Sequence, residues 1–113
     1  MSMKEQQIAA LEQQIKDAQA SLELGKALTN LRQNPDFKKL MIDGYLKNEA
    51  IRLVHLKADP SMSSQANQAA VIRDIDAIGA IDQYFRAIAM MGARAEISIA
   101  DAEQAILDIQ EEE

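Results

Sequence analysis

A narrow apolar stripe runs along the C-terminal third of the chain. Its members are apolar or small and recur at alternating steps of three and four residues, the spacing of core positions in a heptad repeat. Because these steps keep the stripe on one side of a helix, a second helix has to cover it. We take these stripe residues as the candidate helix-packing and interaction residues: Ile78, Ile81, Phe85, Ile88, Gly92, Ala95, Ile99, Ala102, Ile106 and Ile109.

The stripe belongs to the longest of three predicted helices, which spans residues 64–110. Ser64 is a candidate N-cap, and no Pro interrupts the segment. Such a helix would be about 70 Å long at 1.5 Å rise per residue. Ser98, followed three residues later by Asp101, resembles a weak capping box, so a break at residues 96–98 stays open as an alternative.

The first predicted helix covers residues 4–32 and begins with the same spacing of three and four. Its early apolar positions are Ile8, Leu11, Ile15, Ala18 and Leu22. Beyond them we expect the register to slip at Gly25, with Leu24, Leu28 and Leu31 carrying the apolar face onward.

The second predicted helix covers residues 35–58. Asn34 is a good N-cap, Pro35 suits the first helical position, and Asp36 favours the positive end of the helix. We therefore expect a kink at Pro35 after the first helix. The apolar face is broad, which suggests contact with more than one neighbour; it comprises Phe37, Leu40, Met41, Gly44, Tyr45, Leu46, Ala50, Leu53, Val54 and Leu56.

A polar turn at residues 59–64 reverses the chain between the second and third helices. The prediction is one all-α domain over residues 1–113, a long antiparallel helical hairpin that resembles a coiled coil. In it, residues 35–58 face residues 66–88, and residues 4–32 face residues 88–109. Apolar residues off the stripe exceed what one hairpin can bury, so we expect a homo-oligomer or a larger partner protein; they are Ile72, Ile75, Met90, Met91 and Ile97.

The composition agrees with helix packing. Two Phe, two Tyr and no Trp leave burial to aliphatic side chains, and the lack of Cys excludes disulfides and thiolate metal sites. The longest apolar run, residues 87–93, is too short to span a bilayer, and residues 1–14 hold no apolar run like that of a signal peptide. We expect a soluble intracellular protein with no membrane partner.

The net charge of −6 is concentrated at one end of the chain. Residues 101–113 hold six acidic residues and no Lys or Arg, whereas the other hundred residues hold twelve of each sign. This acidic end is either a solvated helix end or a docking element for a basic surface. Residues 32–57 carry three more basic than acidic residues. That excess is a solvated helix face, a nucleic-acid patch, or a surface that meets the acidic end of a neighbouring copy.

Residues able to carry out catalysis are sparse. His55, the single histidine, has Arg52 and Asp59 on either side and lacks a Glu or His three or four residues away, so we expect a surface residue and no metal ligand. Asp74 and Asp76 point in nearly opposite directions on a helix. No Gly-rich phosphate loop or Ser/His/Asp set is present. We expect no catalytic residue, no cofactor, no metal and no enzymatic activity.

Residues 34–50, continuing to Leu56-Lys-Ala-Asp-Pro60, together with residues 77–86, resemble short helical proteins of tailed bacteriophages. The resemblance covers roughly residues 30–95 and transfers no functional residue. It implies a virion or head-assembly component, found in the virion or in the cytoplasm of the host bacterium. Two alternatives stay open: a small regulatory protein that inhibits a host protein, and a nucleic-acid-associated module that uses residues 35–58.

Overall fold

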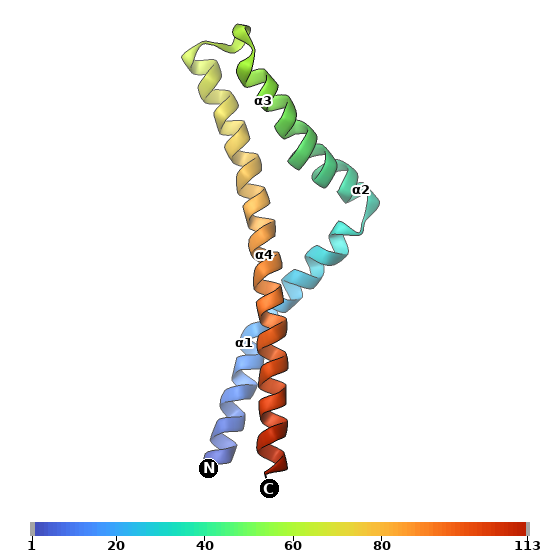
Figure 1. The fold of residues 1–113 in the computed structure, drawn as a ribbon, viewed down its shortest axis with the longest axis vertical. Helices are drawn as coiled ribbons and strands as arrows, with labels where there is room; N and C mark the ends of the chain where they lie inside the picture. Colours follow the sequence, from blue (N-terminus) through green and yellow to red (C-terminus); the bar gives the residue numbers. More distant parts are fainter. Residues whose placement is uncertain (1, 113) are drawn as a thin grey trace. The chain divides into compact units, whose positions relative to one another are not determined.

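The fold is all-α, as predicted. The computed structural model describes residues 2–112, and no strand occurs among them. The elements in chain order are α1 (Met3–Arg32), α2 (Pro35–Phe37), η1 (Lys38–Glu49), α3 (Ala50–Ala58), η2 (Pro60–Met62) and α4 (Gln65–Glu111) (Figure 1). The observed bounds of α1 and α4 lie within one residue of the predicted ones. The predicted alternative of a break at residues 96–98 is not realised, since α4 is continuous there.

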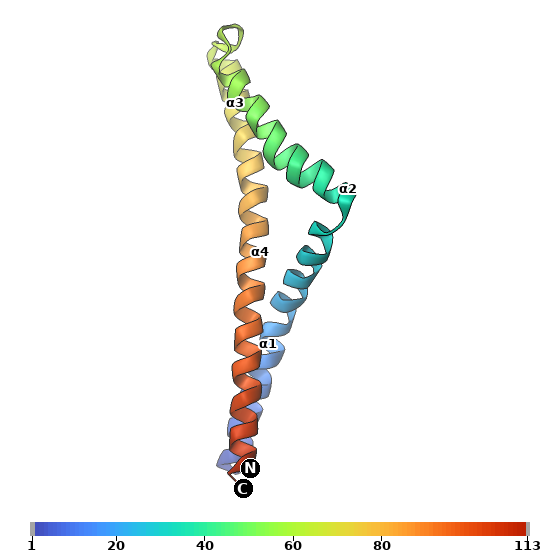
Figure 2. The same cartoon turned by 45° about the vertical axis from the view of Figure 1, so that its right-hand side comes forward.

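The chain divides into two compact units, both of which contain part of α4. The terminal unit combines the chain up to Leu28 with the chain from Ile88 onward, and the loop unit is Thr29–Ala87. Within the terminal unit, α1 and the C-terminal half of α4 run side by side in opposite directions (Figures 1 and 2). The predicted facing of residues 4–32 with 88–109 is thereby confirmed up to Leu28. The predicted facing of 35–58 with 66–88 is confirmed by the contact of Leu53 with Val71 and Ile78 in the loop unit.

In the terminal unit, α1 turns one apolar face toward α4. The five predicted early positions are all half-buried, and Leu28 is buried. The predicted continuation of the apolar face is confirmed for Leu28, which is buried, and is wrong for Leu24 and Leu31, which are 50% and 43% exposed. Gly25 is half-buried and lies three residues after Leu22 and three before Leu28, so the apolar face reaches Leu28 through Gly25 and not through Leu24. A pattern of apolar side chains misses such a position because glycine has none.

The loop unit has its core where α3 packs on the N-terminal half of α4. Leu53, Val71 and Ile78 are buried together. Six half-buried residues surround them, drawn from η1, α3, η2 and α4: Tyr45, Leu46, Ala50, Leu56, Met62 and Ile75. The core thus lies next to the turn at residues 59–64 and fixes the two arms of that turn against each other.

Side-chain caps define where α2 and α4 begin. The Asn34 side-chain oxygen accepts hydrogen bonds from the backbone N–H groups of Asp36, at 2.9 Å, and Phe37, at 3.1 Å. The Ser64 hydroxyl accepts one from the N–H of Asn67 at 3.1 Å. Each cap satisfies donors that the first turn of a helix leaves unpaired. The predicted interruption at Pro35 is confirmed.

The predicted second helix is not a uniform α-helix. Its middle part, η1, is π-helical over twelve residues, and only α3 continues as an α-helix. A π-helix closes its hydrogen bonds over five residues instead of four. A Cβ built at Gly44 would lie 2.9 Å from the carbonyl oxygen of Lys39, five residues earlier, so a side chain at this position would require the backbone to shift. The apolar pattern gave no sign of the change, since no residue type is specific to a π-helix.

Candidate interaction surfaces

All ten stripe residues are withdrawn from solvent in the structure. Four are buried, namely Ile78, Gly92, Ala95 and Ala102. The other six are half-buried: Ile81, Phe85, Ile88, Ile99, Ile106 and Ile109. None is fully exposed, which is what a stripe facing a partner helix requires. Their part in binding other molecules stays a prediction.

An aromatic contact joins α2 to α4 in the loop unit. The rings of Phe37 and Phe85 meet edge to face, with centroids 6.1 Å apart and planes at 68°. Aromatic pairs favour this arrangement because the positive ring edge meets the negative ring face. The neighbouring Tyr84 ring, whose centroid is 6.1 Å from that of Phe85, is exposed. Phe85 therefore anchors the short helix that follows Asn34.

A glycine pair brings α1 and α4 into backbone contact in the terminal unit. A Cβ built at Gly25 would lie 3.0 Å from the Cα of Gly92, and one built at Gly92 would lie 2.9 Å from the Cα of Gly25. Only residues without side chains fit at both positions. The sequence placed Gly92 on the apolar stripe, and Gly25 is the facing residue that it did not indicate.

A polar contact crosses the same seam at a different level. The Gln14 side-chain amide donates to the carbonyl oxygen of Ser98 at 3.2 Å and to the Ser98 hydroxyl at 3.0 Å. Together with the glycine pair, this contact fixes the antiparallel register of α1 and α4. The residue considered as a helix break is therefore a contact point within a continuous helix.

Large apolar side chains remain exposed on the outer faces of both units. On α4 of the terminal unit, Met90 and Ile97 are seven residues apart and share one face. On α3 of the loop unit, Ile51 and Val54 are three residues apart and share another. Of the five off-stripe residues that the sequence left without a partner, only Ile75 packs on the core. The other four are exposed: Ile72, Met90, Met91 and Ile97.

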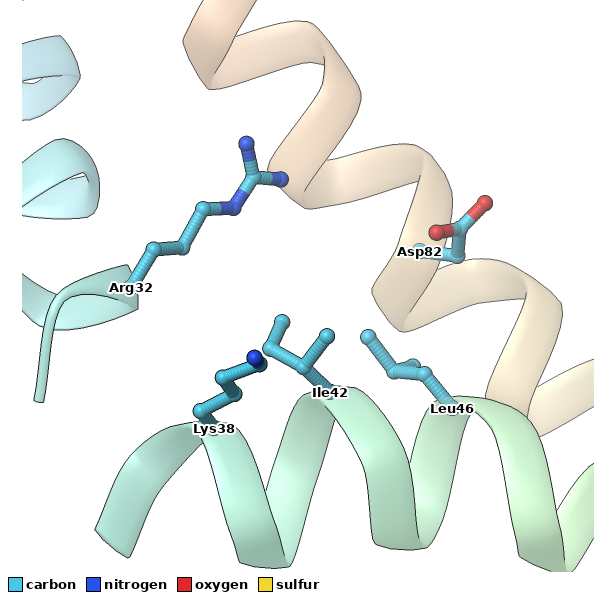
Figure 3. A pocket seen from close by; sticks show the side chains of 5 residues that line it. All are labelled: Arg32, Lys38, Ile42, Leu46 and Asp82. Atoms are coloured by element: carbon cyan, nitrogen blue, oxygen red, sulfur yellow. The ribbon is translucent and has the colours of Figure 1, made fainter. Parts of the chain in front are cut away.

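A hollow of about 360 Å³ opens on the surface of the loop unit. It is lined by Arg32 from the end of α1, Lys38, Ile42 and Leu46 from η1, and Asp82 from α4. Figure 3 shows the Arg32 side chain extending toward α4, and Ile42 and Leu46 projecting from η1 into the same space. The hollow combines two basic groups at its edge with an apolar floor.

The charged side chains form ordinary helix pairs. Arg52 binds Glu49 and Arg86 binds Asp82, the latter with 2.7 Å between Nε and Oδ2. His55 is exposed. Within residues 2–112, no group of three or more His, Cys, Asp or Glu side chains is arranged to hold a metal ion.

Asp59 caps the turn between α3 and α4. Its carboxylate accepts a hydrogen bond from the backbone N–H of Ser61 at 2.8 Å. That bond and a second one from the Ser61 hydroxyl lower the pKa of Asp59 below its usual value of 3.8, because both stabilise the ionised form. The ionised carboxylate is therefore part of the turn at neutral pH.

Comparison with protein families, with curated proteins and with solved structures finds no match for this chain. In the described part of the chain, no helix combines the length and the apolar character that crossing a membrane requires. The function of the chain has to be inferred from its own surfaces, namely the exposed apolar faces and the hollow of the loop unit.

Proposed function

We propose that the chain is a non-enzymatic assembly protein that acts by packing its helices against further copies of itself or against a larger protein. One observation carries the proposal. Among the described residues, twelve large hydrophobic side chains are exposed, whereas six apolar residues are buried, two of them alanines. Isolated apolar residues are common on protein surfaces, but an excess over the buried core is typical of a surface that a partner covers.

The accessible area supports the same conclusion. The chain exposes 8163 Å² at a mass of 12.5 kDa. A folded monomeric protein of this mass exposes about 6200 Å². The difference of about 2000 Å² is more than twice the roughly 800 Å² that each partner buries in a protein–protein interface of standard size. Association would thus remove from water a surface that the single chain leaves exposed.

The resemblance of residues 30–95 to short helical proteins of tailed bacteriophages supports a particular setting for this activity. In that setting the chain is a virion or head-assembly component, and its partners are its own copies or a larger virion protein. Purification at native abundance distinguishes this setting from host regulation. The proposal is supported if the main species that co-purifies is a virion protein or further copies of the chain. It is contradicted if the main species is a single host protein.

Light scattering on purified variants tests the packing itself. Replacing both Ile51 and Val54 with Gln removes apolar area from the outer face of α3 and keeps good helix formers there. Replacing the exposed Lys57 with Gln, on the same helix, is the matched control. We expect the double variant to have a lower molar mass in solution than the wild type, because fewer copies associate, and the control to have the wild-type molar mass. The proposal would be contradicted if the wild type, the double variant and the control had equal molar masses, and if replacing both Met90 and Ile97 with Gln also left the molar mass unchanged.

A further inference from the structure

We propose that the hollow of the loop unit binds the acidic C-terminal end of α4 from a second copy of the chain. This inference rests on the proposed function, because it names one contact by which copies associate. The hollow is defined by Arg32, Lys38, Ile42, Leu46 and Asp82. The acidic end consists of residues 101–112 within the described part of the chain.

The hollow offers positive charge that no acidic side chain pairs within residues 2–112. Asp82, its one acidic residue, accepts a hydrogen bond from Arg86 at 2.7 Å and is thereby neutralised. Within residues 2–112, neither Arg32 nor Lys38 forms an ion pair, and both are exposed. Ile42 and Leu46 are half-buried and lie one and two helical steps beyond Lys38 (Figure 3). A fitting ligand therefore presents acidic groups beside an apolar side chain.

The acidic end of α4 presents that combination on one face. Leu107 is 50% exposed, so the terminal unit buries only half of it. Glu103 precedes it by four residues and Glu111 follows it by four, and both are exposed. Residues four apart on a helix are neighbours on the same face. Glu103 and Glu111 can thus meet Arg32 and Lys38 while Leu107 covers the apolar floor.

The same features favour a copy of the chain over nucleic acid as the occupant. Phosphate backbones are bound by several basic groups and a polar surface, whereas this hollow has two free basic groups and two aliphatic side chains. Residues 101–112 carry five acidic residues and no base, so their charge is opposite in sign to that of the hollow. An acidic and partly apolar helix is therefore the better complement.

Charge reversal with exchange tests the contact in the full chain. The first variant carries Arg32→Glu and Lys38→Glu, and the second carries Glu103→Lys and Glu111→Lys. Each alone brings like charges together between copies, so we expect the dissociation constant of self-association to rise about tenfold at low salt and less at high salt. Mixing the two variants places opposite charges together again, and we expect mixed assemblies as stable as those of the wild type.

A matched control separates position from net charge. Lys47→Glu with Lys57→Glu changes the total charge as much as the first variant does, but both lysines are exposed and lie outside the hollow. We expect wild-type association from this control, and wild-type helicity by circular dichroism from every variant. Sedimentation velocity with one partner fluorescently labelled reports the mixed assemblies directly.

The possible results distinguish this contact from the proposed function. Three results would overturn the contact and leave the proposed assembly function standing. Both charge-reversed variants could associate as tightly as the wild type, the control could associate as weakly as those variants, or the mixture could fail to associate. A wild-type chain that stays monomeric would overturn the contact, and it would overturn the proposed function as well only if no virion or other protein co-purifies with the chain. Binding of a labelled DNA duplex that is lost only in the Arg32 and Lys38 variant would assign the hollow to nucleic acid instead.

Discussion

Replacing Gly92 with Ala tests the backbone contact between α1 and α4 in the terminal unit. The added Cβ would lie 2.9 Å from the Cα of Gly25 and 3.4 Å from the carbonyl oxygen of Ser21. Since nonbonded carbon atoms pack at about 3.5–4.0 Å, the two backbones would have to separate by about 0.6–1.1 Å. The obstructing atom is the backbone Cα of Gly25, so no side chain can rotate away to make room, whereas the distance to Ser21 is an ordinary contact.

The expected change in stability is the sum of two opposing effects. Overpacking of this kind costs about 1–3 kcal/mol. Ala stabilises a helix interior by about 0.8–1.0 kcal/mol relative to Gly. Gly92→Ala should therefore lower the unfolding free energy by between about 0 and 2 kcal/mol. Gly79→Ala is the matched control on the same helix, because nothing lies within 4 Å of a Cβ built there. It should stabilise the protein by about 1 kcal/mol.

Thermal unfolding followed by circular dichroism measures both variants. All proteins are compared at one concentration, because association makes the Tm concentration-dependent. The two variants should differ by the overpacking energy, which corresponds to a Tm difference of roughly 4 °C or more for a chain of this length. Gly25→Ala should behave like Gly92→Ala. If Gly92→Ala raises the Tm as much as Gly79→Ala does, the glycine contact does not exist in solution.

Three other tests address the seam, a cap and a pH effect. Phe85→Asp should lower the unfolding free energy by several kcal/mol, since the charge would replace a ring in a half-buried contact. His55→Ala should change the unfolding free energy by less than about 0.5 kcal/mol, because His55 is exposed. A larger effect from His55→Ala than from Phe85→Asp would show that the register assigned to the stripe is wrong. Asn34→Ala should cost about 1 kcal/mol in urea unfolding, with Asn34→Asp as the conservative control. Because the pKa of Asp59 is lower in the folded state, its stabilising effect is present above the unfolded value of 3.8 and is lost as the pH falls through the folded value. The Tm difference between the wild type and Asp59→Asn should accordingly shrink between pH 5 and pH 3, and a constant difference would contradict this.

The repeat of apolar positions was sufficient to predict the helices and their antiparallel pairing. The stripe residues on α4 and the early positions on α1 follow one spacing, and side chains of that spacing are buried together. The caps at Asn34 and Ser64 were also predictable, because a cap depends on residues close in sequence. Local signals of this kind determine where a helix begins.

Two features depend on contacts that the sequence pattern does not encode. The role of Gly25 depends on the backbone of Gly92, which lies far away in sequence, so the apolar pattern did not indicate it. The hollow depends on Arg32, Lys38 and Asp82, which come from three different elements. The basic excess of residues 32–57 indicated a positive surface, but only the packing of η1 and α4 places an apolar floor beside it. The π-helical turn at Gly44 was missed for a different reason, since no residue type is specific to a π-helix.

Sedimentation equilibrium of the unmodified chain tests most directly whether the exposed apolar faces are covered by assembly. The measurement covers nanomolar to micromolar concentrations, with helicity checked by circular dichroism on the same samples. We expect a mass that rises with concentration from 12.5 kDa to a multiple of it. A fully helical chain that stays at 12.5 kDa up to micromolar concentration, and that co-purifies with no virion or other partner, would contradict assembly as its function.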